Sequence, residues 1–345
     1  MKLLIRIVLP LCLLSCASFV RAQPFHDLQE GLIDYPVPFP TAIRALLDES
    51  PSLLDPSTVR NSTFGIGSTW SSGGTRTSAG FELAPLLISD AVGLSEYLYS
   101  RLTRVLLRTR ISVAASLPDD GHISPAFGLR FMLHDDADLR AYSLYQDILN
   151  EWDKQAPMRD IAPPAANKED SARHAAALTL IMEESRRKFI RDKIDSLRQT
   201  IQETYWNLSV VEMAFNAVYH SVGDNDLAVQ RYVGYVSGGW PMLGSNSQIV
   251  FGLGGWVGRF VEFSDYERLA SFQVRQYLGT TVERLYLEEK VDWANTDMPG
   301  YRVGLGSTQR LADGLWIRDN VSLALKGPAR PNASLSLTFG TPELH

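Results

Sequence analysis

The sequence predicts an all-β transmembrane antiparallel β-barrel of about 12 strands with an inserted α-helical hairpin. Three observations support this fold class. The chain begins with an export signal, most of it consists of short segments in which apolar residues alternate with small or polar ones, and one internal stretch changes to a helical period. After the signal no uninterrupted apolar run reaches the length of a transmembrane helix, so a membrane-spanning chain would have to cross with strands.

Residues 1–22 have the composition of a secretory signal peptide. Lys2 and Arg6 precede an apolar run from Ile7 to Leu14, and small residues lead to Ala22. We expect cleavage near Ala22, so that the mature chain starts at Gln23. An alternative is a lipoprotein signal, in which the run from Leu13 to Cys16 is the cleavage box and Cys16 carries the lipid.

Composition excludes several classes of site and partner. No cysteine follows Cys16, which excludes disulfides, zinc-thiolate centres and cysteine nucleophiles from the folded chain. Removal of the three basic residues of the signal leaves 30 basic against 39 acidic residues, a net charge of −9. So acidic a chain is not expected to bind nucleic acid. No cofactor and no metal ion is predicted.

Residues 23–61 are predicted to form an N-terminal periplasmic arm. This segment is rich in proline and in acidic residues, and only the stretch from Thr41 to Leu47 has helical character.

Two blocks of strands follow, strands 1–4 over residues 62–135 and strands 5–12 over residues 206–340, with a short tail at 341–345. Between Ile123 and Leu133 every odd position is apolar, whereas the even positions carry small residues, Arg130 or Met132. The predicted strands are 63–70, 77–87, 104–113, 123–133, 211–220, 227–238, 248–258, 270–282, 285–291, 301–307, 315–325 and 332–339.

Residues 136–205 are predicted to form the helical hairpin. The apolar period changes from two to about 3.6, with Tyr145 and Trp152 on one stripe and Ile190 and Leu197 on another. If the N-terminus is periplasmic, this insert between strands 4 and 5 is periplasmic too, and it could cap the barrel or bind a periplasmic partner.

A barrel explains the residue types better than a soluble sandwich does. The non-apolar face of the strands is dominated by Gly, Ala, Ser and Asn with scattered Arg, which suits a crowded interior, whereas a sandwich would carry Lys, Glu and Thr on its surface. Tight turns are predicted at Ser71–Gly74, Pro118–Gly121 and Gly223–Asp226. Aromatic residues lie at strand ends, where membrane barrels have interfacial girdles: Trp70, Trp206, Tyr219, Trp240 and Trp293.

On these features the chain resembles Gram-negative outer-membrane β-barrel proteins as a class, over residues 62–340. The resemblance implies an outer-membrane location, contact with outer-membrane lipid, and insertion by the barrel-assembly machinery. It departs from the usual pattern at the C-terminus, because Gly340 to His345 follow Phe339, whereas such chains commonly end on an aromatic residue.

The inward faces of the predicted strands carry charged side chains in which arginine outnumbers acid eight to three. Such an interior would attract anions if it were hydrated, which suggests a narrow channel for small or anionic solutes. Alternatively the arginines pair with Glu82, Glu212, Glu283 and the acidic N-terminal arm and fill a closed barrel, which then serves as a membrane anchor or interaction scaffold through its helical insert. The residues expected to line the lumen are Arg76, Glu82, Arg104, Arg108, Arg110, Arg130, Glu212, His220, Arg275, Glu283, Arg302 and Arg318.

Signals for an enzyme are weak, and a hydrolase is the third alternative. His220 and Ser221 are neighbours on a strand, so their side chains point to opposite faces and do not form a base and nucleophile pair. No catalytic residue is predicted. Gly252, Gly254 and Gly255 resemble a glycine-rich phosphate-binding loop only superficially, because they lie inside a strand and no phosphate-binding lysine follows them. An acidic helix cap explains His134, Asp135, Asp136 and Asp138 better than a calcium loop does.

Overall fold

The structure is a computed structural model of the 345-residue chain. It describes residues 39–47, 62–71, 74–88, 100–117, 123–136, 207–222, 226–242, 246–259, 266–280, 282–294, 299–312, 314–325 and 331–340, together with single helical turns between 147 and 193.

Twelve strands form one closed antiparallel barrel, in which each strand pairs with its neighbours in the sequence and β1 pairs with β12. The predicted fold class and strand number are therefore confirmed. The strands are β1 (Ser62–Ser71), β2 (Gly74–Leu83), β3 (Arg110–Leu117), β4 (Ser124–Asp135), β5 (Val210–Val222), β6 (Asp226–Pro241), β7 (Ser247–Arg259), β8 (Tyr266–Gly279), β9 (Glu283–Ala294), β10 (Gly300–Ala312), β11 (Leu315–Ala324) and β12 (Pro331–Gly340).

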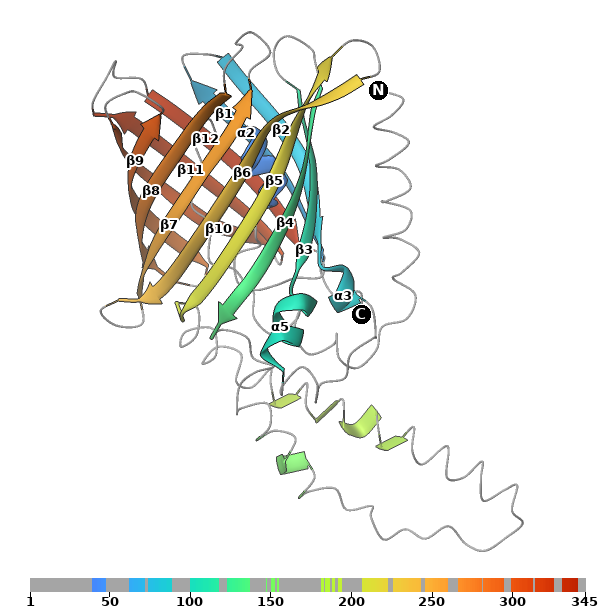
Figure 1. The fold of residues 1–345 in the computed structure, drawn as a ribbon. Coiled ribbons are helices and arrows are strands. Elements are labelled where there is room, and N and C mark those ends of the chain that lie inside the picture. The colour runs from blue at the N-terminus through green and yellow to red at the C-terminus, as the bar shows by residue number, and fades with distance from the viewer. Residues whose placement is uncertain are drawn as a thin grey trace, which may run out of the picture.

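The barrel has two distinct ends (Figure 1). We call the end where β1 begins and β12 stops the base, because Thr63 lies opposite Gly340 there, and the opposite end the rim, where Ser71 pairs with Gly74. The two long connections, β2 to β3 and β4 to β5, both leave from the base. The β10–β11 turn at the base is tight, and Gly314 in it has a φ of 70°, which glycine adopts without strain.

The predicted strand over 104–113 is wrong in its first half. Arg101–Leu107 forms the helix α5, which Ser100 begins by accepting a hydrogen bond from the backbone N–H of Thr103 at 3.2 Å, and β3 starts only at Arg110. Leu102, Val105 and Leu106 have the spacing of a helical stripe, whereas Val105 and Leu107 have that of an alternating strand, and the serine cap decides for the helix. Strand β2 likewise ends at Leu83, and the short helix α3 (Pro85–Ile88) follows it.

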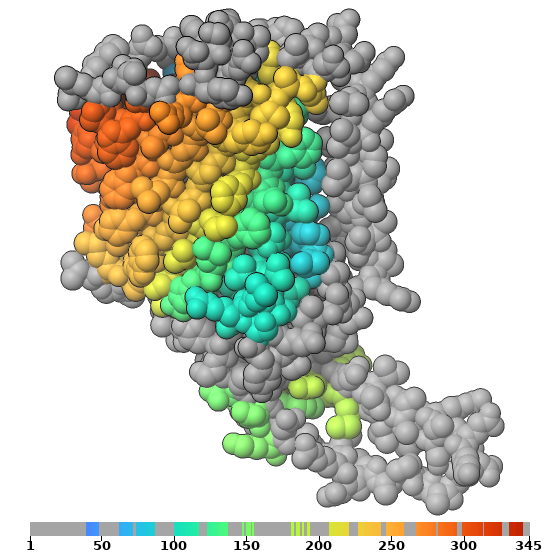
Figure 2. Space-filling model, viewed as in Figure 1, coloured from blue at the N-terminus to red at the C-terminus, as the bar shows by residue number. Residues whose placement is uncertain are grey.

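The burial of the strands is inverted relative to that of a water-soluble protein. In β9, Leu285 and Leu287 are exposed, whereas Tyr286 and Glu288 between them are buried. Leu305 on β10 is 63% exposed, whereas Glu82 on β2 is 1% exposed. Exposed apolar side chains recur along β3 to β8, which form the outer face seen in Figure 2. An apolar exterior on a closed sheet is the arrangement that a lipid bilayer requires, because no backbone group is left unpaired at an edge.

Exposed aromatic side chains lie near both ends of the barrel. Trp70 at the end of β1 and Trp293 at the end of β9 lie toward the rim, and Trp240 at the end of β6 lies toward the base. Tyr219 packs edge-to-face on Phe127, with ring centroids 5.8 Å apart. Trp206 lies outside the described residues. Two aromatic belts of this kind match the interfaces of a membrane.

The helix predicted at Thr41–Leu47 is present as α2, and it lies inside the barrel, not outside it (Figure 1). All seven of its residues are buried. An isolated helix of two turns is unstable in water, so contacts with the barrel wall must stabilise it. This part of the predicted periplasmic arm is therefore an internal plug.

The insert at 136–205 is described only in part. Its described residues between 147 and 193 are helical, and the two arms touch: the rings of Trp152 and Phe189 are 5.4 Å apart, and Lys193 pairs with Glu151 at 2.8 Å. These contacts are consistent with two helices packed side by side. Across the described residues, none of the helices is both long and apolar enough to cross a bilayer.

Candidate functional site

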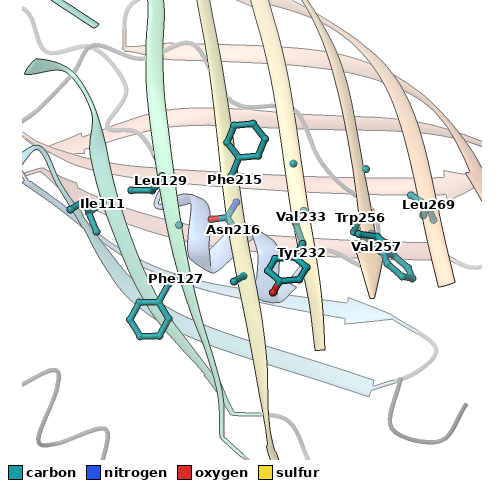
Figure 3. A pocket seen from close by; sticks show the side chains of 14 residues that line it. Ile111, Phe127, Leu129, Phe215, Asn216, Tyr232, Val233, Trp256, Val257 and Leu269 are labelled. Carbon is teal, nitrogen blue, oxygen red and sulfur yellow. The ribbon is translucent and has the colours of Figure 1, made fainter. Parts of the chain in front are cut away.

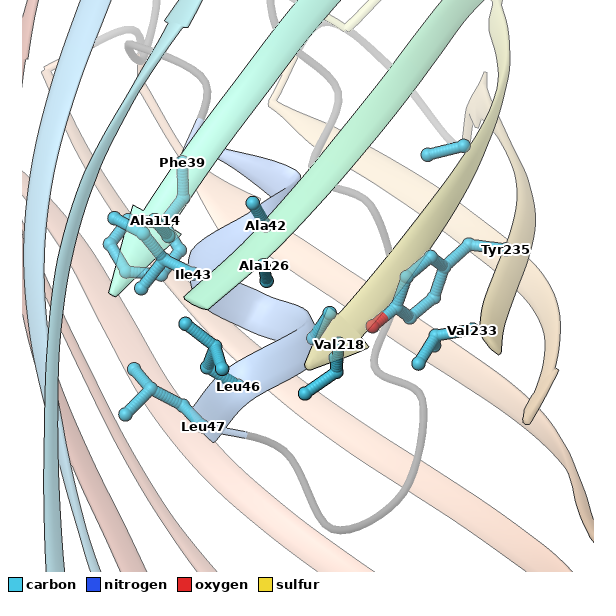
Figure 4. Packing of buried hydrophobic residues seen from close by; sticks show 12 residues of the cluster. Phe39, Ala42, Ile43, Leu46, Leu47, Ala114, Ala126, Val218, Val233 and Tyr235 are labelled. Carbon is cyan, nitrogen blue, oxygen red and sulfur yellow. The ribbon is translucent and has the colours of Figure 1, made fainter. Parts of the chain in front are cut away.

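The lumen is the candidate site, and α2 occupies the part of it that faces β1 to β5. The apolar side of the helix packs on small inward-facing side chains of the wall. Ile43 and Leu46 belong to one buried cluster with Ala114, Ala126 and Val218 (Figure 4). The small residues on these strands, which the sequence shows as an alternating pattern, therefore provide the space for a helix.

Two glycines of β1 are required by the same packing. A Cβ atom at Gly65 would lie 2.9 Å from Cδ of Pro40, and one at Gly67 would lie 2.8 Å from Cδ1 of Leu47. Both distances are shorter than carbon atoms tolerate without movement. The glycines thus let the helix lie directly against the strand.

The N-terminal end of α2 is bound by the wall. The backbone N–H of Thr41 donates to Oε2 of Glu82 at 3.1 Å, and the backbone N–H of Ala42 donates to Oγ of Ser112 at 3.0 Å. The first N–H groups of a helix have no partner within the helix, and a carboxylate there is stabilised by the helix dipole. Glu82 and Ser112 therefore satisfy groups that would otherwise be buried without partners.

Glu82 is also one member of a buried ionic quartet that spans four adjacent strands. Arg110 Nη1 lies 3.3 Å from Glu82 Oε1 and its Nη2 lies 3.3 Å from Glu212 Oε2, while Arg130 Nε lies 2.5 Å from Glu212 Oε2. All four side chains are at most 1% exposed. Two cations balance two anions, which makes burial of the group tolerable, whereas removal of one partner would leave an uncompensated charge.

The C-terminal end of α2 is bound from another strand. Arg231 on β6 donates from Nη2 to the backbone carbonyl of Ala45. Unpaired carbonyls at the end of a helix favour a cation in this position. The plug is thus held at both ends by charged groups of opposite sign.

A second charged group covers the wall on β8 and β9. Arg275 donates from Nε to Glu288 at 2.8 Å and from Nη1 to the hydroxyl of Tyr277 at 2.9 Å, and its guanidinium lies 4.3 Å from the ring centre of Tyr286. Tyr286 in turn donates to the backbone carbonyl of Asp319 on β11 at 2.9 Å. This wall is therefore rigid and strongly polar.

The inner face of β10 to β12 carries several polar side chains that are partly exposed, although Thr308, Trp316 and Thr338 on the same face are buried. Arg302 is 33% exposed at the side chain and lies 3.9 Å from Asp292, and Arg318 donates to Thr308 at 3.3 Å. α2 makes its main contacts with β1 to β5, so this side is left accessible. The accessible stripe consists of Arg302, Arg318, Asn320, Ser322, Asn332, Ser334 and Ser336.

Strand register and burial place most of the residues predicted for the lumen on the inward face. Glu82, Arg110, Arg130 and Glu212 meet in the quartet, and the others do not join it. His220 shares the inward face of the buried Val218. The remaining inward-facing members are Arg76, Arg275, Arg302 and Arg318.

Three predicted lumen residues lie elsewhere. Arg104 belongs to helix α5, and Arg108 follows that helix and pairs with Asp135 at 3.8 Å, so neither lies on a strand. Glu283 is exposed on the outward face with Leu285, one residue away from the inward-facing Arg284. The prediction for Glu283 was wrong because the alternation of β8 was continued into β9, although the turn between the two strands changes which positions face inward.

Several inward-facing charges were missed by sequence reasoning. Arg44 lies on α2, and only the acidic groups of the N-terminal arm were expected to reach the lumen. The other missed residues alternate with apolar residues on their strands, which is the signal of an inward-facing position. In β9 the adjacent pair Glu288 and Glu289 obscures this alternation. The missed residues are Arg44, Arg231, Glu267, Arg284, Glu288, Lys290, Asp292 and Arg310.

The described acidic residues at the end of β4 already have partners. His134 Nε2 lies 3.1 Å from Oδ1 of Asp136, and Asp135 pairs with Arg108. Within the described part of the chain, no group of three or more His, Cys, Asp or Glu side chains has the arrangement of a metal site.

No family model matches the chain, and no curated protein matches its sequence. Among solved structures, the KdgM porin is 4% identical with a TM-score of 0.40, and the alignment covers 81% of this chain and 99% of that one. The NanC porin is 5% identical with a TM-score of 0.40, and the alignment covers 81% and 100% of the two chains. The outer membrane protein Omp33 of Acinetobacter baumannii is 8% identical with a TM-score of 0.34, over 82% and 98%. The chain has the fold of an outer-membrane β-barrel, and its own closed sheet and apolar exterior carry that assignment.

Proposed function

We propose that this protein is a narrow outer-membrane channel that prefers small anions, with its passage between α2 and the inner face of β10 to β12. One observation carries the proposal: polar side chains on the inner face of β10 to β12, such as Arg302, Asn320 and Ser334, are partly exposed, whereas those that hold α2 are buried. An accessible polar path through an apolar barrel is what conduction of a hydrated ion requires.

The charge of the lumen supports a preference for anions. Inward-facing basic residues outnumber acidic ones among the described residues, and the quartet neutralises only part of them. A confined path lined by one sign of charge raises the local concentration of the opposite ion. The basic members are Arg44, Arg76, Arg110, Arg130, Arg231, Arg275, Arg284, Lys290, Arg302, Arg310 and Arg318, against Glu82, Glu212, Glu267, Glu288 and Asp292.

Planar-bilayer recording of the purified mature chain tests this function. We expect small unitary currents and a reversal potential in a salt gradient that reports selectivity for anions. The same recordings on a chain without residues 136–205 separate conduction through the barrel from any effect of the insert. Absence of current from both proteins, and from a variant with a weakened plug such as Glu82→Gln, would contradict the channel.

A closed barrel that serves as a scaffold is the second candidate. The contacts between Trp152 and Phe189 and between Glu151 and Lys193 favour it, because they indicate an ordered helical pair attached to the base of the barrel. A periplasmic partner would bind this pair. Cross-linking from residue 186, which is exposed on the insert, would identify such a partner in intact cells. Recovery of no partner would count against the scaffold.

Two further steps of biogenesis belong to the proposal. The signal peptide is removed near Ala22, which N-terminal sequencing of the mature protein would test. The barrel-assembly machinery inserts the chain through the last strand, β12. Depletion of that machinery should leave the protein unfolded and sensitive to protease in the periplasm.

A further inference from the structure

The connection between β2 and β3 places two short helices at the base of the barrel. α5 contacts both α3 and the strand β4 (Figure 1). It leads directly into β3, because the backbone N–H of Thr109 donates to the carbonyl of Leu106 at 3.1 Å and the strand begins at Arg110. A helix of this length spans about 10 Å, and the headgroup layer on each side of a bilayer is about 5–8 Å deep. The helix α5 therefore lies within reach of that layer.

Two leucines of α5 are exposed on a side that does not face the barrel. Leu102 is 69% exposed and Leu106 is 47% exposed, and residues four apart share one side of a helix. Leu107 is buried, and it lies about 100° round the helix from Leu106. Leu86 on the neighbouring helix α3 is exposed as well. The packing of α5 on the barrel therefore leaves its leucine side uncovered.

This apolar surface continues from the outer wall of the barrel. Ile111 at the start of β3 is exposed and pairs with Leu129, which is exposed on β4. Both residues line the apolar hollow of the outer wall, together with Phe127 (Figure 3). Leu106 lies one helical turn before this strand, so apolar exposure extends without a polar break from the wall to the helix. Such continuity indicates that α5 meets the same surroundings as the wall, which is the membrane.

The remaining charged residues of α5 are both cations. Arg101 is exposed, Nε of Arg104 has no hydrogen-bond partner, and the helix contains no acidic residue. Across the part of the chain that the structure describes, neither guanidinium forms an ion pair, whereas Arg108 just beyond the helix pairs with Asp135. A guanidinium binds phosphate with two hydrogen bonds, and a cation beside exposed leucines is typical of a helix at a membrane surface. Charge complementarity therefore favours anionic phospholipid.

We propose that α5 lies in the headgroup layer of the membrane at the base of the barrel and binds anionic phospholipids there. Leu102 and Leu106 would enter the acyl region, and Arg101 and Arg104 would bind the phosphates. The base is expected to be periplasmic, where phospholipids form the leaflet. The contact would fix the depth of the barrel on the side of β3 and β4, and it does not depend on conduction through the lumen.

A spin label on the helix tests this placement. The mature chain, which is expected to start at Gln23, contains no cysteine, so a single cysteine carries the label without background. Leu102→Cys is the reporter, Ile111→Cys on the outer wall is the reference for lipid, and Lys154→Cys on the insert is the reference for water. Collision with oxygen, which enters lipid, is compared with collision with a nickel chelate, which stays in water. The proteins are folded into vesicles of phosphatidylcholine, alone or with an equal amount of phosphatidylglycerol.

In the mixed vesicles we expect the label at residue 102 to collide more often with oxygen than with nickel, at a depth between the two references. Arg101→Gln and Arg104→Gln should each lower the ratio of lipid-embedded to water-exposed label about fivefold. Lys154→Gln is the matched control and should leave that ratio unchanged. The difference between native and arginine variants should disappear in pure phosphatidylcholine.

Three results would overturn the proposal. One is a label at residue 102 that is as exposed to nickel as the label at residue 154. Another is a depth that neither phosphatidylglycerol nor the arginine substitutions change. The third is a label shielded from both reagents, because protein would then cover the helix, and deletion of residues 136–205 would show whether the insert is that cover. If Leu102→Cys does not fold, Leu106→Cys carries the label on the same side of the helix.

Discussion

Glu82 on β2 accepts a hydrogen bond at 3.1 Å from the backbone N–H of Thr41, and the same carboxylate group pairs with Arg110 on β3 at 3.3 Å. A single side chain thus joins the plug helix to the ionic quartet of the wall. The position of the helix depends on the charge of this residue.

Glu82→Gln should loosen the plug. It exchanges a charge-assisted hydrogen bond, which contributes about 1.5–3 kcal/mol, for a weaker neutral one. The difference of about 1–1.5 kcal/mol should lower the ratio of docked to undocked helix roughly 5- to 12-fold, and recordings should show longer or larger openings. The quartet is left with an excess cation, so the barrel should also unfold at lower denaturant concentration. Glu283→Gln is the matched control, since Glu283 is exposed on the outer face. Equal currents from both variants would refute the role of Glu82.

Arg231→Met should release the other end of the helix. The substitution keeps an apolar stem but removes the donor to the carbonyl of Ala45. A loss of about 1.5 kcal/mol corresponds to a shift of about tenfold in the docked population. Single-channel recording measures the change, and the double variant with Glu82→Gln should open more than either single one. If Arg231→Lys gives the same current as Arg231→Met, the contact requires the geometry of the guanidinium. If Arg231→Met, Arg231→Lys and the double variant all give the native current, Arg231 does not hold the helix.

Arg302→Gln and Arg318→Gln should reduce the preference for anions. Each removes one positive charge from the accessible stripe. At the short distances of a narrow passage one charge contributes about 1 kcal/mol, so the anion-to-cation permeability ratio should fall roughly fivefold for each substitution. Reversal potentials in a potassium chloride gradient provide the ratio. Arg101→Gln on the exposed surface of α5 should leave it unchanged, and an unchanged ratio in all three variants would place the conducting path elsewhere.

Tyr286→Phe should lower the free energy of unfolding by about 1 kcal/mol, because the backbone carbonyl of Asp319 loses the hydroxyl that donates to it. Tyr301→Phe is the matched control. Its hydroxyl donates to Glu289 at 3.2 Å at an exposed position, where water can replace the lost bond, so the expected change is much smaller than that of Tyr286→Phe. Equilibrium unfolding in urea, with the proteins folded into lipid vesicles, compares the two. Equal effects would show that the bond to Asp319 contributes nothing specific.

The barrel could be predicted from the sequence because a strand between lipid and a polar lumen has a period of two that survives in the residues themselves. Segments such as Ile123–Leu133 show it directly. The prediction failed at Arg101–Leu107, where an amphipathic helix and an alternating strand place apolar residues at overlapping positions. A local contact, the cap at Ser100, resolves that ambiguity.

The site was less predictable than the fold. The stretch Thr41–Leu47 is a short helix in an acidic, proline-rich segment, and nothing local shows that it lies inside the barrel. Its position depends on Glu82, Ser112 and Arg231, which contribute from three different strands. Periodicity detects which face a residue lies on, but it does not detect which side chains meet across the lumen.

The clamp on α2 also constrains the order of folding. Thr41 and Glu82 are 41 positions apart, whereas the partners Ala45 and Arg231 are 186 apart. The helix cannot be held at both ends until half of the sheet has formed, so an early intermediate with β1 to β5 alone would bind it weakly. Full seating of the helix therefore requires β2 and β6 together, and protection of its backbone amides from hydrogen exchange would report that both strands are in place.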